Sequence, residues 1–184
     1  MRRLGVLVIS LTLAASATGE DRLSSPYRDQ MLTEIRGLTQ KEISDLREAR
    51  GMGLARAAEL NGYPGPRHLL DAEREGQLHL SPDQVRTVTR LFDAMLRDAK
   101  RVGDRVLGEE RDLERQFRAA TITEPDLRAR LARIAALQAE LRMIHLRTHL
   151  ETRPVLSSHQ RERYNELRGY TAGPLGEHGH RHPE

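Results

Sequence analysis

Two five-residue segments of this chain share one pattern: a leucine, a serine, two further residues and a glutamine. The serine hydroxyl can accept a hydrogen bond from the backbone N–H three residues later, while the glutamine side chain reaches back to the serine N–H. This reciprocal arrangement, a capping box, is typical of a helix start. Its residues here are Leu80, Ser81, Gln84, Leu156, Ser157 and Gln160. The pattern predicts that one helix begins at each segment.

The first segment is predicted to be the firmer helix start. Pro82 falls at the first helical position, where its fixed φ is favourable and its missing N–H is not needed. Leu80 precedes the cap and Val85 follows it by four residues, so the two can pack as a hydrophobic staple. The second segment has Arg161 in place of the staple residue, so we expect it to hold its helix less firmly.

Two long helices are predicted between the segments. In residues 82–118 the apolar positions alternate three and four residues apart, interrupted at Gly103 and Gly108, which is the period of a coiled-coil-like seam. These positions are Val85, Val88, Phe92, Met95, Ala99, Val102 and Val106. A second helix is predicted at 125–151, with Thr123 as its cap and an end at Pro154. The short turn between two long helices predicts an antiparallel hairpin.

Shorter helices are predicted on either side of the hairpin. Apolar spacing predicts a first helix at 27–60, interrupted near Gly51 and Gly53, which ends at the turn residues 61–66. A short helix is expected at 67–75 and a closing helix at 158–168. Because so thin a hairpin cannot bury both faces of either helix, we expect the first helix and a second protomer to cover it.

The N-terminus predicts export. Residues 1–3 are Met-Arg-Arg, residues 4–13 form an apolar run, and Ala15-Ser16-Ala17 is an A-x-A cleavage site, the three parts of a secretory signal peptide. An uncleaved membrane anchor is the alternative, but the apolar run is about half the ~20 residues that a spanning helix needs. We therefore expect a signal peptide at 1–17 and a periplasmic protein.

The mature chain is expected to form one helical domain at 18–170, followed by a disordered tail at 171–184. The sequence has no cysteine, so an exported fold is held without disulfides. Arginine is largely balanced by Asp and Glu, which leaves a formal net charge of +3. That balance and the predicted export disfavour a nucleic-acid partner.

The two L-[ST]-x-x-Q segments, the signal peptide, the helical pattern and the missing cysteines resemble the CpxP/Spy/ZraP group of small exported bacterial proteins. That LTxxQ-motif family includes the CnrX-like periplasmic heavy-metal sensors. The resemblance covers residues 28–168, with serine in place of threonine in both motifs. It implies an all-α fold: an elongated bent helical hairpin with a first helix packed across it, a short closing helix, and an antiparallel homodimer that forms a shallow curved cradle.

His145 and His149 are the first candidate ligands. They lie four residues apart in a helical segment, so both imidazoles share a face and can bind one Zn²⁺, Ni²⁺, Co²⁺ or Cu²⁺ ion. In an antiparallel hairpin, Asp93 or Asp98 is expected opposite His145 and can supply a third ligand. CnrX-like sensors are similar in using a histidine and a sulfur ligand at this spacing. The alternative is that both rings pack at the edge of the seam.

The remaining histidines give weaker patterns. His178, His180 and His182 alternate in the tail, a composition that binds metals loosely, and ZraP-like proteins are similar in linking zinc to chaperone activity. The alternative is a solubilising tail. His68, His79 and His159 stand alone and are interpreted as surface residues.

A row of arginines on the helix at 82–118 is the candidate client-binding surface. Its members are Arg86, Arg90, Arg97, Arg101 and Arg105. On the concave side of a cradle they can hold acidic or unfolded chains while their stems cover apolar surface. The alternative is a solvated face with local ion pairs such as Asp93–Arg97 and Glu114–Arg118.

These patterns leave two functions open. The first is an ATP-independent periplasmic chaperone or stress adaptor that binds unfolded or misfolded proteins, or a membrane-bound signalling partner, and requires no cofactor. The second is a heavy-metal sensor or resistance protein that binds a divalent transition metal through His145, His149 and the tail. An enzyme is not expected, because the sequence contains no nucleophile–base set, phosphate-binding loop or dinucleotide fingerprint.

Overall fold

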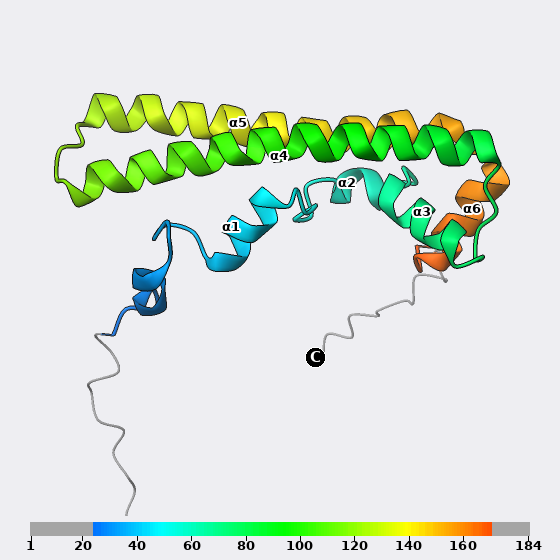
Figure 1. Cartoon of the computed structure of the whole chain (residues 1–184), viewed down its shortest axis with the longest axis horizontal. Helices are drawn as coiled ribbons and strands as arrows, with labels where there is room; N and C mark the ends of the chain where they lie inside the picture. The colour runs from blue at the N-terminus through cyan, green and yellow to red at the C-terminus, as the bar shows by residue number, and fades with distance from the viewer. Residues whose placement is uncertain (1–23, 171–184) are drawn as a thin grey trace, which may run out of the picture.

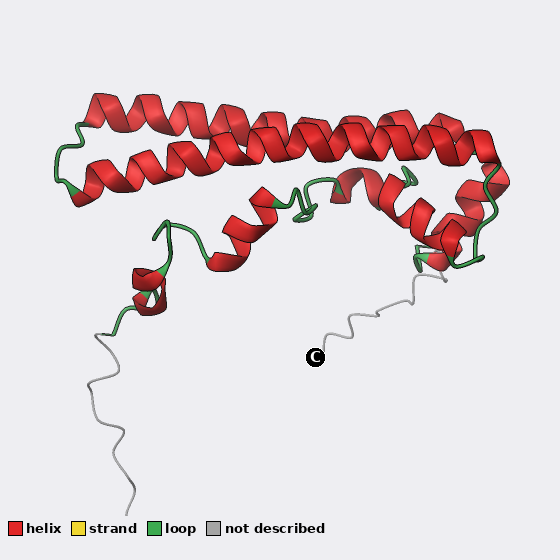
Figure 2. Cartoon of the chain, viewed as in Figure 1, coloured by secondary structure: helices red, strands yellow, loops and turns green. Residues whose placement is uncertain are grey.

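The computed structural model describes residues 24–170, so the predicted signal peptide and the histidines of the tail lie outside the described residues. Within that range the chain is all-helical, and no strand forms (Figure 2). The two longest helices are α4 (Pro82–Arg118) and α5 (Glu124–Thr152). None of the helices described is long and apolar enough to cross a membrane.

Helices α4 and α5 lie side by side and run in opposite directions (Figure 1). The turn between them includes Ala120 in the left-handed region, with φ of 52°. Thr123 then caps α5, because its hydroxyl accepts from the N–H of Asp126. Near this turn Arg130 of α5 donates to Glu109 of α4 at 2.7 Å. At its far end α5 gives way after Thr152 to the short 3₁₀ helix η3 (Arg153–Val155), which contains Pro154.

The predicted first helix at 27–60 is interrupted near Gly51 and Gly53 as expected, but residues 33–39 also break it. The structure divides it into η2 (Arg28–Leu32), α1 (Gln40–Arg47) and α2 (Arg56–Glu59). Between α1 and α2 the chain leaves helical geometry at three residues with positive φ, Ala49, Met52 and Gly53. Two of the three are not glycine, so the glycine interruptions in the sequence did not reveal how strongly the segment is broken.

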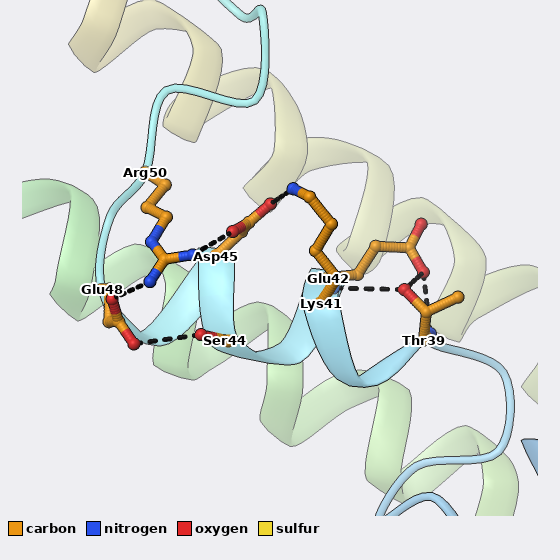
Figure 3. Close-up of polar contacts among 7 residues, drawn as sticks. All are labelled: Thr39, Lys41, Glu42, Ser44, Asp45, Glu48 and Arg50. Atoms are coloured by element: carbon orange, nitrogen blue, oxygen red, sulfur yellow. Dashed lines mark hydrogen bonds and ion pairs between the residues drawn. The ribbon is translucent and has the colours of Figure 1, made fainter.

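Helix α1 is short but strongly capped (Figure 3). Thr39 and Glu42 form a third capping box, in which the Thr39 N–H donates to the Glu42 carboxylate at 2.8 Å. The buried carboxylate of Asp45 accepts from Lys41 and from Arg50, the latter at 3.3 Å. The hydrogen bond from Lys41 is the main reason why the pKa of Asp45 is lowered. These contacts stabilise α1, which with eight residues is too short to be a stable helix by itself.

Two apolar clusters hold the molecule together. The first lies where α1 crosses the middle of α4 and α5, and its helical members are Ile43, Leu46, Ala99, Val102, Val106, Leu107, Leu137, Leu141 and Ile144. Gly103 lies at this crossing, and a Cβ there would be 2.3 Å from the carbonyl oxygen of Leu46. The glycine that interrupts the predicted seam therefore lets the two backbones touch.

The second cluster lies at the end of α4 where both L-S-x-x-Q segments are found. It joins α3 (Pro66–Arg74) and α6 (Ser158–Leu167) to the start of α4. Its buried members are Leu69, Ala72, Leu78, Leu80, Val88, Leu156 and Tyr164. Both motif leucines therefore enter one core, which fixes the two helix starts next to each other.

Candidate functional site

Both L-S-x-x-Q segments form the predicted capping boxes. The Ser81 hydroxyl accepts from the backbone N–H of Gln84, and the Ser81 N–H donates to the side-chain oxygen of Gln84 at 2.9 Å. Ser157 and Gln160 repeat this geometry at the start of α6. At the staple position, Arg161 donates to the carbonyl oxygen of Leu156 at 2.6 Å, so the second segment replaces an apolar contact with a hydrogen bond.

The two boxes also bind each other. The Gln84 amide nitrogen donates to the Gln160 side-chain oxygen at 2.8 Å, and the Gln160 nitrogen donates to the Gln84 oxygen at 2.9 Å. Each nitrogen also donates to the backbone of the opposite segment, from Gln84 to Val155 at 2.8 Å and from Gln160 to His79 at 2.9 Å. Both amides therefore use all their donors, and the repeated motif is one interlocked junction rather than two separate helix caps.

A cavity of about 590 Å³ lies between residues 48–71, the two long helices and the residues that follow α6, Arg168 and Tyr170. Its wall includes both candidate metal ligands, His145 and His149, together with His68 and Met95. His68 is partly buried, so its interpretation as a surface residue is wrong, and burial lowers its pKa. His79 and His159 are exposed, as expected.

His149 has its ring orientation fixed by the backbone. Its Nδ1 lies 2.7 Å from the carbonyl oxygen of Tyr63, and because a carbonyl only accepts, Nδ1 must carry the proton. In the neutral form of this tautomer the lone pair is on Nε2. This nitrogen faces Gly65, where a Cβ would lie 3.3 Å from it. A histidine with its Nδ1 proton held by a carbonyl is the arrangement found at metal-binding imidazoles.

His145 is buried without a hydrogen bond at Nε2. Burial is the main cause, and the neighbouring His149 a second cause, of the lowering of its pKa. His145 is therefore neutral at pH 7 and has an unengaged ring nitrogen. Two imidazoles one helical turn apart can supply half of a tetrahedral coordination shell.

The expected third ligand is not in place. Asp93 is exposed on α4, Asp98 lies 3.9 Å from Arg101, and no three His, Cys, Asp or Glu residues in the described range are grouped for a metal. The residues present therefore fit a two-histidine site that needs further ligands. Residues 171–184, which contain His178, His180 and His182, are outside the described range.

Glu59 of α2 is a polar residue that sequence reasoning missed. One of its oxygens accepts from the Tyr164 hydroxyl at 2.8 Å, Arg168 at 3.1 Å and the Tyr170 hydroxyl at 3.2 Å. The Tyr164 oxygen also accepts from the Gly65 N–H at 3.2 Å. This network ties α2 to α6 across the cavity rim. No local signal distinguishes Glu59 from an ordinary surface glutamate, since its partners lie about a hundred positions later.

The candidate client-binding arginines are all exposed on α4. Arg101 and Arg105 reach Glu140 of α5 at 3.7 and 3.2 Å, while Arg86 pairs locally with Asp83. Arg90 donates to the Thr87 hydroxyl at 3.3 Å. Arg97 forms no ion pair with the residues described, so the suggested Asp93–Arg97 pair does not form. The arginine surface is thus a mixture of cross-helix ion pairs and cations available to solvent, while the suggested Glu114–Arg118 pair does form.

Comparisons of this chain with protein-family models, with curated proteins and with solved structures find no match. The residues and their geometry are therefore the basis of the functional proposal that follows.

Proposed function

We propose that this protein is an exported, ATP-independent chaperone or envelope-stress adaptor of the CpxP/Spy type that binds non-native polypeptides reversibly. In this proposal the α4/α5 pair is a bent hairpin, and two copies form a curved periplasmic cradle. The observation that carries the proposal is that large apolar side chains stay exposed along a thin helical body: Tyr27, Met31, Leu32, Phe117, Leu131, Met143 and Leu150.

Within this proposal, the best candidate for the client-binding surface is the end of the molecule near the α4/α5 turn. Residues Glu34 and Arg36 contact Arg111 and Glu114 of α4, which holds the N-terminal segment beside this end. Leu32, 94% exposed, and Phe117, 56% exposed, flank those contacts in sequence. Unfolded chains display apolar residues, and exposed apolar patches bordered by charge are typical of protein-binding surfaces.

Suppression of aggregation tests this function. The mature protein should reduce light scattering from a chemically denatured client after dilution, without ATP. Leu32→Glu combined with Phe117→Glu should weaken the effect several-fold, because charge at these positions opposes apolar contact. Arg86→Ser combined with Arg97→Ser tests the arginine surface in the same assay. No suppression by the wild-type protein at stoichiometric excess would contradict the proposal.

The alternative is a periplasmic heavy-metal sensor or resistance protein, favoured by the fixed tautomer of His149 and the unengaged Nε2 of His145. These two nitrogens would hold Zn²⁺, Ni²⁺, Co²⁺ or Cu²⁺ together with ligands from elsewhere. As a sensor, the protein would pass the signal to a membrane-bound partner.

Calorimetric titration with each metal separates the possible sites. If the double variant His145→Ala and His149→Ala loses metal binding, the site is at these two histidines of α5. If removal of residues 171–184 abolishes metal binding, the site is at His178, His180 and His182. Equal binding by wild type and both variants would exclude both assignments.

A further inference from the structure

The cavity beside the two α5 histidines has apolar walls. The chain from α1 to α3 runs along the α4/α5 pair (Figure 1), and the cavity of about 590 Å³ lies between them. Helix α4 contributes the partly buried Phe92, Met95 and Leu96. Met52 and Leu60 line the cavity from the segment before α3, and they are 41% and 59% exposed. This volume and lining are typical of a site for a small organic molecule, which would cover these side chains.

His145 and His149 are the buried polar part of the lining. Only 6% of His145 and 7% of His149 are exposed. Among the residues described, the Nε2 of neither ring has a hydrogen-bond partner, since Tyr63 binds His149 through Nδ1. Buried polar groups are normally hydrogen-bonded, so the two nitrogens favour an occupant that carries a polar substituent.

The charges around the cavity leave one cation unpaired. Four arginines and three carboxylates line the cavity, and each carboxylate is paired with one of the arginines. The pairs are Arg50–Glu48 at 2.6 Å, Arg168–Glu59 at 3.1 Å and Arg67–Asp71 at 3.2 Å. Arg56, the fourth arginine, forms no ion pair with the residues described. One positive charge therefore remains for an anionic occupant to balance.

The backbone at Gly53 makes room for the Arg56 side chain. Gly53 has φ of 73°, a conformation that favours glycine, and a Cβ there would lie 3.0 Å from Arg56 Nη2. The guanidinium therefore lies against the bare backbone of Gly53, and both residues line the cavity. A guanidinium is planar and can donate two parallel hydrogen bonds to one carboxylate, so Arg56 is suited to a carboxylate ligand.

We propose that this cavity binds a small organic carboxylate with an apolar body. The carboxylate pairs with Arg56, and the apolar body packs on Phe92, Met95 and Leu96. An aromatic body gains most, because rings make favourable contacts with both thioether and aromatic side chains. A hydroxyl on that body meets the free nitrogens of the two histidines. The site is separate from the surface proposed for non-native chains and requires no metal.

Other small molecules fit the same walls less well. An organic cation would meet a lining in which arginines outnumber carboxylates. A phosphate dianion would need more than the one unpaired cation, since like the carboxylates of the lining it must be balanced when it leaves water. A sugar would leave the apolar side chains of α4 without apolar contact. Charge and apolar surface together therefore favour a monovalent anion with an apolar body.

Titration with 2-naphthoate tests the site. The chain has no tryptophan, so the fluorescence of the naphthalene ring can be followed without interference from the protein. The wild-type protein should bind one 2-naphthoate. The neutral 2-naphthamide should bind at least tenfold more weakly, because it lacks the charge that Arg56 balances. Equal binding of the two probes, or no saturable binding of 2-naphthoate up to its solubility limit, would overturn the proposal.

Removal of the unpaired cation tests where the carboxylate lies. Arg56→Gln should raise the dissociation constant of 2-naphthoate at least tenfold and leave that of 2-naphthamide nearly unchanged. Arg97→Gln is the matched control and should have no effect, since Arg97 is exposed and does not line the cavity. Helical circular dichroism should be the same in all three proteins. Equal effects of the two variants would mean that the probe responds only to net charge, which would overturn the assignment to Arg56.

Two further measurements separate this site from the proposed functions. Leu32→Glu with Phe117→Glu, which should weaken client binding, should leave 2-naphthoate binding unchanged; a loss would place the probe on the client surface instead. The titration should also give the same dissociation constant with and without EDTA. Loss of binding in EDTA would mean that a metal holds the carboxylate, which would also overturn the assignment to Arg56.

Discussion

Single residues decide how closely the segments of this molecule approach one another. At Gly103 the absence of a side chain lets the backbone of α1 lie on α4, and at Gly65 a Cβ would lie 3.0 Å from the ring of His149. The sequence marked Gly103 only as an interruption in a seam. Its role could not be predicted, because the contact depends on a segment more than fifty residues earlier.

Replacing Gly103 with alanine should therefore destabilise the protein. The added methyl group meets the carbonyl oxygen of Leu46 at 2.3 Å, so α1 must shift, at a cost of about 1–3 kcal/mol in the free energy of unfolding. Gly108 is the matched control in the same helix, with nothing within 4 Å of a Cβ. Gly108→Ala should stabilise by ~0.5–1 kcal/mol. Urea denaturation measures both, and equal effects would contradict the close approach.

The burial of His145 predicts a dependence of stability on pH. Its folded pKa is lowered from 6.5, so the neutral form is favoured in the folded state and the contribution is complete above about pH 6.5. As the pH falls below 6.5 the unfolded chain takes up the proton first, and this stability is lost by the folded pKa. His145→Gln should flatten the fall in melting temperature between about pH 7 and pH 5. The exposed His159→Gln should leave that slope unchanged; a similar flattening by both would exclude His145 as the cause.

At the scale of elements, local signals in the sequence predicted most helix boundaries. Pro82, Thr123 and Pro154 place the ends of α4 and α5 because caps and prolines act within a few residues. The same signals predicted both capping boxes. They did not predict that Gln84 and Gln160 bind each other, since this requires the whole α4/α5 pair to return the chain to its starting point. The break at residues 33–39 was missed because the apolar spacing continues through it, from Ile35 to Leu38 and Ile43.

The interlocked junction predicts that the two glutamines are energetically coupled. Gln84→Ala removes three hydrogen bonds across the junction in addition to its cap, and should cost about 2–3 kcal/mol. A double-mutant cycle with Gln160→Ala should give a coupling energy of ~0.5–3 kcal/mol. Once Gln84 is replaced, the hydrogen bonds between the two side chains are already lost, so Gln160→Ala cannot remove them again. Chemical denaturation of the four proteins measures it.

The box of α1 provides the control for this cycle. Glu42 caps its own helix through Thr39 and forms no hydrogen bond with the junction. Glu42→Ala should cost about 1 kcal/mol and add independently to Gln84→Ala. Additive effects of Gln84→Ala and Gln160→Ala would mean that the two boxes act as separate caps.

At the scale of the whole molecule, one short crossing helix and one junction hold a helical pair about 55 Å long, as ~1.5 Å per residue gives for α4. This leaves much of the pair in water, with arginines on α4 and apolar residues such as Met143 and Leu150 on α5. The sequence predicted the all-helical character of the chain from its apolar spacings and helix caps. It could not predict which faces stay open, since that depends on where the divided N-terminal segment crosses the pair.

The central claim is that these open surfaces bind non-native chains. Fluorescence anisotropy with one labelled client, prepared both as the native protein and as a permanently unfolded form, tests it most directly. We predict saturable binding of the unfolded form, weakened several-fold by Leu32→Glu with Phe117→Glu, and no binding of the native form. Failure to bind the unfolded form at concentrations that suffice for dimer formation would contradict the claim.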